Sequence, residues 1–186
     1  MLENPLVKFS EDKARHAKSL CELGRWREVL DFALSWQKSD PEEHRAAFYA
    51  GLGYAGTGQF AQAEKAYRYA LQLNARDIKA WNNLGGLLFE HLRRPLDGIH
   101  CLEEALKLNP DNKLGWLNLS GMALKLGMPE RALDHAQKAL SLDPRLIEAL
   151  LCKGAAAKAL RRPDLIQQVC ESLSKISPED YRPARR

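Results

Sequence analysis

The sequence predicts an all-α protein made of a row of antiparallel helical hairpins. Three observations support this fold class: the chain repeats about every 34 residues, apolar residues recur at helical spacing, and each copy has a Gly or Pro near its middle. No segment shows the sustained alternation of apolar and polar residues that a half-buried β-strand requires. Each copy is therefore predicted to fold as a helix, a turn and a second helix.

The repeat is clearest where successive copies end. The segments LQLNARD, LKLNPDN and LSLDPRL align, and this register gives equivalent positions spaced by 34, 35, 34 and 34 residues: Pro41, Ala75, Pro110, Pro144 and Pro178. A period of this length is typical of stacked helical hairpins. We expect an N-terminal extension over residues 1–9, a single domain over 10–180 and a basic C-terminal tail over 181–186. The five repeats within that domain span residues 10–43, 44–77, 78–112, 113–146 and 147–180.

The first helix of every copy carries a small residue at one equivalent position: Ala17, Gly51, Gly85, Ser120 and Gly154. A small side chain at a fixed helix position allows two backbones to approach closely. We therefore expect each first helix to contact its neighbour at this position.

The second helix of every copy has its core residues at positions i, i+4 and i+7, which lie on one face of an α-helix. Proline at positions 95, 129 and 163 suits the first turn of these helices, where a missing N–H costs nothing. Copy three has one extra residue near 91–94, so it has either a longer first helix or a looser turn. The predicted core face consists of Val29, Ala33, Trp36, Ala63, Tyr67, Ala70, Gly98, Leu102, Ala105, Ala132, Ala136, Ala139, Ile166, Cys170 and Leu173.

The last predicted helix is more polar than its counterparts. Copies two to four have leucine where a following hairpin would pack, whereas copy five has Ser174. The neighbours of Ser174 are polar as well: Gln167, Gln168, Glu171 and Lys175. A polar outer helix is typical of the cap of a helical array.

The third copy, with Trp81, Leu84 and Gly85, and the second, with Gly51 and Tyr67, resemble the tetratricopeptide repeat family. The resemblance covers about residues 10–180 and identifies the chain as a bacterial-type member with about five repeats. It implies a right-handed superhelical solenoid in which the first helix of each hairpin lines a concave wall.

In this family the inward-facing residues lie on the first helices, close to the small-residue position. The resemblance therefore implies a groove that binds a peptide or an amphipathic helix of a partner protein. Its apolar members would anchor the ligand, and its asparagines would hold the ligand backbone, since an amide offers both a donor and an acceptor. Alternatively, neighbouring helices cover the apolar residues, and the asparagines are ordinary exposed helix residues. The expected groove residues are Phe48, Tyr49, Leu52, Lys79, Asn82, Asn83, Leu117, Asn118 and Leu151.

One known ligand of the family is not expected here. Chaperone adaptors hold an acidic C-terminal peptide with a carboxylate clamp of lysine, asparagine and arginine at fixed positions. Counted from copy one, those positions hold Ala14, Lys18, Tyr49, Lys79 and Asn83, and only Lys79 fits. Counting from copy two or copy three also gives one fit each. We therefore expect no binding of a carboxylate-clamp chaperone tail.

Composition supports a globular protein without a membrane span. The chain has 186 residues, 45% of them hydrophobic, and no apolar run approaches the roughly 18–20 residues of a membrane helix. Residues 1–10 lack the features of a secretory signal. The four cysteines are scattered, which indicates small buried or half-buried apolar residues in a reducing compartment and no metal site. We expect a cytoplasmic protein with no membrane association and no cofactor.

The sequence favours an interaction protein over an enzyme. Its five histidines are dispersed, and it has no nucleophile elbow, phosphate-binding loop or HExxH motif. The net charge of +4 is small, so binding of nucleic acid such as RNA is a weaker hypothesis. Paired arginines in the turns at 93–94 and 161–162 could meet an anionic partner, but stabilisation of helix ends explains them better. We expect an adaptor or scaffold, with a self-associating assembly subunit that uses its outer or terminal helices as the alternative; the oligomeric state stays open.

Overall fold

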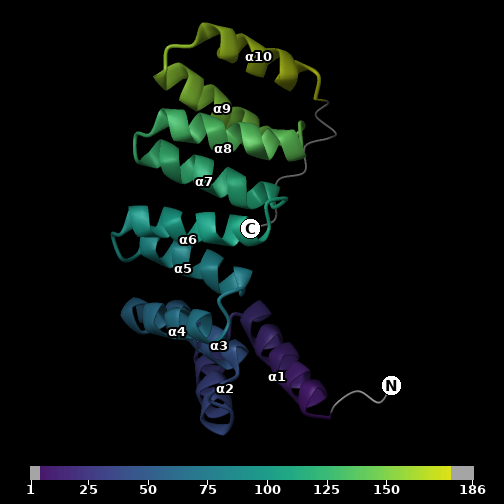
Figure 1. The fold of residues 1–186 in the computed structure, drawn as a ribbon, viewed down its shortest axis with the longest axis vertical. Coiled ribbons are helices and arrows are strands. Elements are labelled where there is room, and N and C mark those ends of the chain that lie inside the picture. Colours follow the sequence, from purple (N-terminus) through teal and green to yellow (C-terminus); the bar gives the residue numbers. More distant parts are fainter. Residues whose placement is uncertain (1–4, 177–186) are drawn as a thin grey trace. The chain divides into compact units, whose positions relative to one another are not determined.

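The computed structural model describes residues 5–176, with side chains described from residue 10 onward. Over these residues it contains ten α-helices and no strand, which confirms the all-α prediction (Figure 1). Successive helices pair as antiparallel hairpins. The helices are α1 (Pro5–Glu22), α2 (Trp26–Ser39), α3 (His44–Gly56), α4 (Phe60–Leu73), α5 (Ile78–Glu90), α6 (Pro95–Leu108), α7 (Lys113–Lys125), α8 (Pro129–Leu142), α9 (Ile147–Ala159) and α10 (Pro163–Ser174).

The chain divides into two compact units, which we call unit 1 (Met1–Ala105) and unit 2 (Leu106–Arg186). Unit 1 contains α1 to α5 and most of α6, and unit 2 contains the end of α6 and α7 to α10. The expected basic tail over residues 181–186 lies outside the described residues, as do residues 1–4 of the expected extension.

Each hairpin turn places one residue in the left-handed backbone region, two positions before the second helix. Glycine does this in three turns, where Gly24, Gly58 and Gly127 have φ values of 69°, 77° and 67°. Arginine does it in the other two turns, where Arg93 and Arg161 both have a φ of 53°. Glycine adopts this conformation without a Cβ clash, whereas an L-residue adopts it at a cost.

The extra residue of copy three lies in its turn. This turn spans residues 91–94, whereas the turns at 57–59 and 126–128 have three residues. Helix α5 has 13 residues, as do α3 and α7. The looser turn is therefore confirmed and the longer first helix is not found. Proline is the first residue of α6, α8 and α10, as predicted.

The core of unit 1 sets large side chains against glycines. Tyr67 on α4 is 1% exposed, and a Cβ at Gly51 on α3 would lie 2.5 Å from its ring. Helices α5 and α6 also approach closely, since a Cβ at Gly85 would lie 2.9 Å from the carbonyl oxygen of Gly98. The close contact expected at the small-residue position is thus confirmed in copies two and three.

The core of unit 2 is made of smaller side chains. Leu119 on α7 is fully buried. Helix α8 buries three alanines and one histidine: Ala132, Ala136, Ala139 and His135. Ser120 holds the small-residue position, and its hydroxyl donates to the carbonyl oxygen of Ala132 at 2.8 Å. A Cβ at Gly154 would lie 3.5 Å from Val169, which is an ordinary van der Waals distance. The close approach expected in copy five is therefore not found.

The buried face of α10 also differs from the prediction. Leu165 and Val169 are buried, whereas Ile166 is 37% exposed and Cys170 is exposed. The predicted column was wrong here because α8 packs against both α7 and α9, while α10 buries the face turned toward α9. The polar residues expected on the outer side of this helix are exposed, as predicted: Gln167, Gln168, Glu171, Ser174 and Lys175.

Two equivalent tryptophans fix the connections between hairpins. The indole nitrogen of Trp81 donates to the carbonyl oxygen of Ala75 at 2.9 Å, and that of Trp116 donates to the carbonyl oxygen of Pro110 at 2.7 Å. Each tryptophan thereby ties the start of its own hairpin to the connection that precedes it.

Candidate functional site

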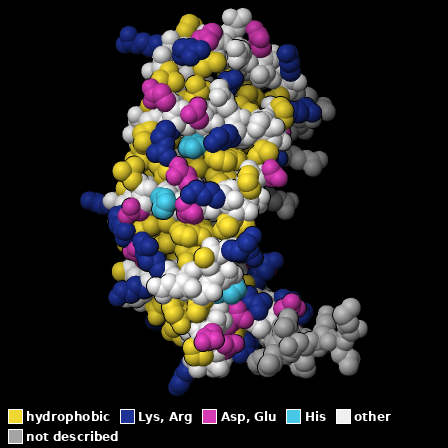
Figure 2. Space-filling view, in the orientation of Figure 1, with side chains coloured by type: hydrophobic (Ala, Val, Ile, Leu, Met, Phe, Trp, Pro, Cys, Tyr) yellow, Lys and Arg dark blue, Asp and Glu magenta, His cyan; other side chains and the backbone are white. Residues whose placement is uncertain are grey.

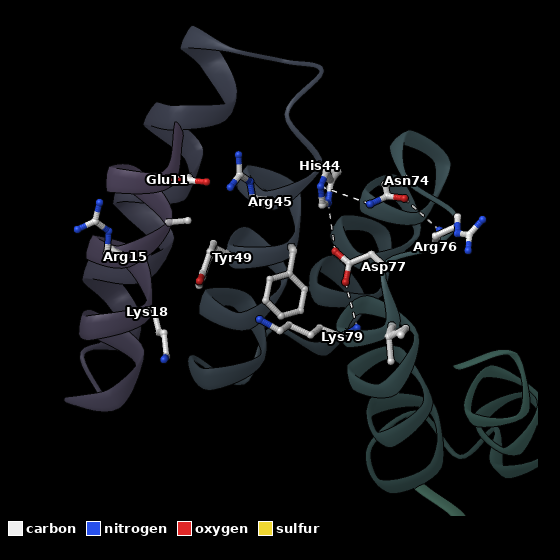
Figure 3. A pocket seen from close by; sticks show the side chains of 13 residues that line it. Glu11, Arg15, Lys18, His44, Arg45, Tyr49, Asn74, Arg76, Asp77 and Lys79 are labelled. Atoms are coloured by element: carbon white, nitrogen blue, oxygen red, sulfur yellow. Dashed lines mark hydrogen bonds and ion pairs between the residues drawn. The ribbon is translucent and has the colours of Figure 1, made fainter. Parts of the chain in front are cut away.

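The first helices of three hairpins line an open hollow in unit 1, which we call the N-terminal groove. Its volume is about 590 Å³. In Figure 3, side chains of α1 form one wall, side chains of α5 and of the connection before it form the opposite wall, and α3 lies between them. The lining residues are Glu11, Ala14, Arg15, Lys18, His44, Arg45, Phe48, Tyr49, Asn74, Arg76, Asp77, Ile78 and Lys79.

The floor of the N-terminal groove is largely apolar. Phe48 is only 7% exposed, because it packs against Tyr67 and meets the ring of Tyr49 edge-on, with ring centroids 5.4 Å apart. Tyr49 is half-buried, and this burial raises the pKa of its hydroxyl, which therefore keeps its proton at neutral pH. The floor thus offers an aromatic surface with one phenolic hydroxyl group.

Arg45 belongs to an internal ion pair at the edge of the floor. It donates to both carboxylate oxygens of Glu43, at 3.0 and 2.9 Å, and to the hydroxyl of Ser10 at 2.6 Å. Partial burial opposes the charge of Glu43, but hydrogen bonds from Arg45 and Ser10 outweigh it and lower the pKa of Glu43 to about 2. The charge of Arg45 is therefore largely neutralised within the fold.

Lys79 differs from the lysine and arginine of the α1 wall. Arg15 pairs with Asp12 at 2.5 Å, and Lys18 lies 3.6 Å from a carboxylate oxygen of Glu22. Among the described residues, the Lys79 ammonium group has no ion-pair partner, and its side chain extends into the groove in Figure 3. Its positive charge is therefore available to a ligand.

A capping carboxylate fixes the α5 wall to the start of α3. One oxygen of Asp77 accepts hydrogen bonds from the backbone N–H groups of Lys79 and Ala80, at 3.0 and 3.1 Å. Its other oxygen lies 3.1 Å from Nδ1 of His44, and the Asn74 side chain lies 3.4 Å from the second ring nitrogen (Figure 3). An N-terminal cap satisfies N–H groups that the helix leaves unpaired. The same cap therefore helps to hold the α5 wall against α3.

A second hollow lies beside α5 in unit 1, and we call it the apolar hollow. Its volume is about 360 Å³. The side-chain nitrogen of Asn83 donates to the carbonyl oxygen of Lys79 in the same helix, at 2.8 Å, so one of its donors is already used. The lining residues are Trp26, Leu52, Ala55, Gly56, Tyr67, Asn82, Asn83, Gly86, Leu87, Glu90 and His91.

The expected groove residues of unit 1 fall in these two hollows. Phe48, Tyr49 and Lys79 line the N-terminal groove, and Leu52 lines the apolar hollow together with the asparagines at 82 and 83. The structure brings them together because they share one side of α3 and α5.

The expected groove residues of unit 2 lie on α7 and α9, which contact each other. Leu117 is half-buried, Asn118 is exposed and Leu151 is 56% exposed. Leu151 is thus a large apolar side chain that the fold of unit 2 leaves in contact with solvent.

Several lining residues were not expected from the sequence. Asn74, Arg76 and Asp77 lie in the connection before α5, and Trp26 and His91 lie at hairpin turns. The repeat pattern points only to positions on the first helices. The residues of the connections between hairpins could also have been predicted to line the groove. Each connection directly precedes a first helix, so its residues lie next to that helix.

The described residues offer no metal site and no membrane span. Among them, no group of three or more His, Cys, Asp or Glu side chains is placed to hold a metal ion. None of the described helices is both long enough and apolar enough to cross a membrane. Of the cysteines, Cys101 is buried and burial raises its pKa to about 11, so it stays a neutral thiol.

Comparison with known sequences supports the repeat assignment. Residues 50–95 and 91–147 match the sequence profile of the tetratricopeptide repeat. BBSome complex member BBS4 of Bos taurus is 26% identical over 140 residues, which are 75% of this chain and 26% of that protein. The match therefore spans about a quarter of the length of BBS4.

Comparison with solved structures shows the same fold. The crystal structure of MamA matches with a TM-score of 0.75 at 19% identity, over 86% of this chain and 93% of that one. YrrB, described as a TPR protein with an unusual peptide-binding site, matches with a TM-score of 0.73 at 18% identity, over 95% of this chain and 94% of YrrB.

Proposed function

Because this chain belongs to the tetratricopeptide repeat family, we propose that it is an interaction adaptor whose N-terminal groove binds a segment of a partner protein. The segment is an extended peptide or an amphipathic helix, two common modes of peptide recognition. The observation that carries this proposal is the open groove of about 590 Å³ with an apolar floor and polar walls. Ligand sites in proteins commonly combine these properties.

Different residues of the groove make different contacts with the ligand in this proposal. The exposed parts of Tyr49 and Ile78 bury an apolar side chain of the ligand, and Lys79 bonds an acidic side chain or a carbonyl oxygen. Phe48 supports Tyr49 from below. Because a few buried contacts carry most of the energy in such interfaces, we expect Tyr49 and Lys79 to contribute most.

Asn82 adds a contact to the ligand backbone in this proposal. It lines the apolar hollow next to the groove, and its amide can pair with a peptide group. Asn83 contributes its oxygen, since its nitrogen bonds to its own helix. Replacing Asn82 and Asn83 together with alanine should weaken binding without unfolding the protein, and an unchanged affinity would contradict the role of these asparagines.

The proposal is tested by affinity capture from the native cell. The bait is the full chain as wild type, as the groove variant Tyr49→Ala/Lys79→Ala, and as the control variant Leu34→Ala/Lys65→Ala. Leu34 and Lys65 line a separate hollow between α2 and α4. We expect a partner that the wild type and the control variant retain and the groove variant loses, provided that circular dichroism shows all three folded. Retention of every partner by the folded groove variant would refute the proposal.

Self-association through outer or terminal helices is the competing function. Light scattering at several protein concentrations separates the two, because an adaptor keeps one molar mass and an assembly subunit does not. Nucleic-acid binding has less support. On the face of the molecule that Figure 2 shows, Lys and Arg side chains are scattered among hydrophobic ones. A nucleic-acid site commonly gathers them into a basic patch.

A further inference from the structure

Gly86 is the one helical glycine of unit 1 whose place is not explained by packing. A Cβ at Gly51 would lie 2.5 Å from the ring of Tyr67, and one at Gly53 would lie 2.7 Å from the backbone of Leu30. The helical glycines at 56, 85 and 98 are equally constrained, since a Cβ at each would overlap a neighbouring helix. At Gly86 a Cβ would meet nothing within 4 Å.

A glycine in the interior of a helix weakens that helix relative to alanine. Gly86 lies inside α5, between Ile78 and Glu90, and follows directly after Gly85, which the contact with α6 requires. The fold would therefore be more stable with alanine at position 86. Position 86 therefore holds glycine although no neighbouring atom requires it.

The open space beside Gly86 is the apolar hollow. Leu52 and Leu87 line it, and the aromatic rings of Trp26 and Tyr67 border it. A volume of about 360 Å³ has room for one bulky side chain together with part of its backbone. The absence of a side chain at Gly86 thus leaves this hollow accessible along the surface of α5.

The N-terminal groove and the apolar hollow differ in the sign of their charge. The N-terminal groove is lined by Lys79 and by other lysine and arginine side chains, whereas no Lys or Arg is among the described residues that line the apolar hollow. Its one carboxylate, Glu90, is exposed, and the ring of His91 is stacked on Phe60 with centroids 4.0 Å apart. An acidic side chain would find no cation there and would be repelled by Glu90.

We propose that the apolar hollow binds one bulky uncharged side chain, aromatic or aliphatic, of the partner segment, and that Gly86 is the residue that keeps it open. The backbone of the segment then crosses α5 at Gly86, where the amide of Asn82 reaches it. This inference rests on the proposed function, since the segment that enters the hollow is the one that occupies the groove. Gly86 then helps to determine which side chain the partner segment can place in the hollow.

The test uses N-acetyl-L-tryptophanamide as the probe and the ¹⁵N-labelled full chain, followed by nuclear magnetic resonance. We expect the largest shifts at Gly86 and at the side-chain amide of Asn82. The acidic analogue, N-acetyl-L-aspartic acid amide, should shift them far less. No shift at Gly86 at the solubility limit of the tryptophan probe, or equal shifts with both probes, would overturn the inference.

Two variants make the test specific to position 86. Gly86→Leu should weaken binding of the tryptophan probe by more than about tenfold, because its side chain fills the hollow. The matched control is Gly121→Leu on α7, at the equivalent position of the next repeat, where a Cβ also meets nothing within 4 Å. It should leave binding at the hollow unchanged. Equal binding by Gly86→Leu and wild type would overturn the inference.

Gly86→Ala supplies a second measurement that does not depend on the larger side chain being tolerated. It should raise the midpoint of thermal unfolding by roughly 2–4 °C and also weaken binding of the tryptophan probe. A lower midpoint would show that the fold itself requires glycine, and would overturn the inference. If the probe fails to bind but Tyr49→Ala/Lys79→Ala still loses the captured partner, this inference fails and the proposed function stands.

Discussion

Unit 1 and unit 2 repeat the same helical hairpin but fill the space between its helices differently. In unit 1 a large side chain on the second helix faces a glycine on the first, as Tyr67 faces Gly51. In unit 2 Ser120 bonds to Ala132 on a helix whose buried residues are mostly alanines, and a Cβ at Gly154 would meet Val169 at an ordinary distance. A repeat pattern thus fixes where helices meet. The size of the side chain at each contact depends on the residue that it faces.

The two units also differ on the sides of their first helices that the family uses for binding. In unit 1 these sides carry a charged groove with an aromatic floor, together with the apolar hollow that Asn82 and Asn83 line. In unit 2 they carry exposed leucines, with Leu114 at 44% and Leu151 at 56% exposure. We therefore expect the groove of unit 1 to be the more selective of these two surfaces.

The largest expected effect is on the core of unit 1. Tyr67→Ala should lower the free energy of unfolding by about 3–5 kcal/mol, because it leaves a cavity opposite Gly51 that the backbone cannot close. Denaturant unfolding followed by circular dichroism measures this. The control is Tyr69→Ala on the same helix, where the side chain is half-buried and its hydroxyl donates to the carbonyl oxygen of Pro41. Equal losses for the two variants would contradict the packing described for unit 1.

The same comparison predicts opposite signs at two equivalent glycines. Gly51→Ala should destabilise the protein by about 1–3 kcal/mol, because the new Cβ would overlap the ring of Tyr67. Gly154→Ala should stabilise it by up to about 1 kcal/mol, since its Cβ meets Val169 at an ordinary distance and alanine favours the helix. The midpoints of chemical denaturation report both changes. A loss at both positions, or at neither, would show that the two units are packed alike.

Acid should lower the free energy of unfolding, because it protonates Glu43 in unit 1. Its pKa in the folded state is lowered from 4.5 to about 2, so its charge adds stability above the unfolded value, and this stability is lost as the pH falls from about 4.5 toward 2. We expect a loss of about 1–2 kcal/mol over this range, allowing for solvent screening at a partly exposed group. Urea unfolding at a series of pH values measures it.

Glu43→Gln should remove most of that pH dependence. The control in unit 2 is Asp164→Asn: the pKa of Asp164 is also lowered by its hydrogen bond with Arg162, but that pair is exposed, so the substitution should change the pH dependence less. A larger effect at Asp164 would reverse this ranking.

The smallest expected effect is at the hairpin turns. Arg93→Gly should stabilise the protein by about 0.5–1 kcal/mol, because a φ of 53° suits glycine better than arginine. Arg161→Gly should act alike in unit 2, since the backbone there has the same φ. Thermal unfolding of each variant beside the wild type checks this, and a loss of stability would indicate that the arginine side chain has a role that the turn geometry does not explain.

Much of the fold could be predicted because it depends on local chemistry. Proline at the start of a second helix acts through its own backbone, and a small residue recurs at one position of the first helices, so the repeat register located Pro95 and Gly51 correctly. Other features depend on what lies opposite. The exposure of Cys170 follows from the packing of α10 against α9, and the role of Arg93 in the turn follows from a backbone angle that arginine rarely adopts.

The position of the candidate site could be predicted in part. The first-helix positions pointed to Tyr49, Lys79 and Asn82, and these residues line the two neighbouring hollows because their spacing places them on one side of the hairpins. The spacing could not show that Asn83 bonds to its own helix, nor that Asp77 joins the start of α5 to His44. These depend on side-chain orientation and on contacts between repeats, which the sequence pattern does not specify.

We propose that the groove of unit 1 selects the partner. Titration calorimetry of the captured partner segment tests it most directly, with wild type, Tyr49→Ala/Lys79→Ala in unit 1 and the matched Leu114→Ala/Leu151→Ala in unit 2. We predict a loss of affinity of at least about tenfold, or about 1.4 kcal/mol, for the unit 1 variant and a smaller loss for the unit 2 variant. Wild-type affinity in the unit 1 variant, or a larger loss in the unit 2 variant, would contradict the account.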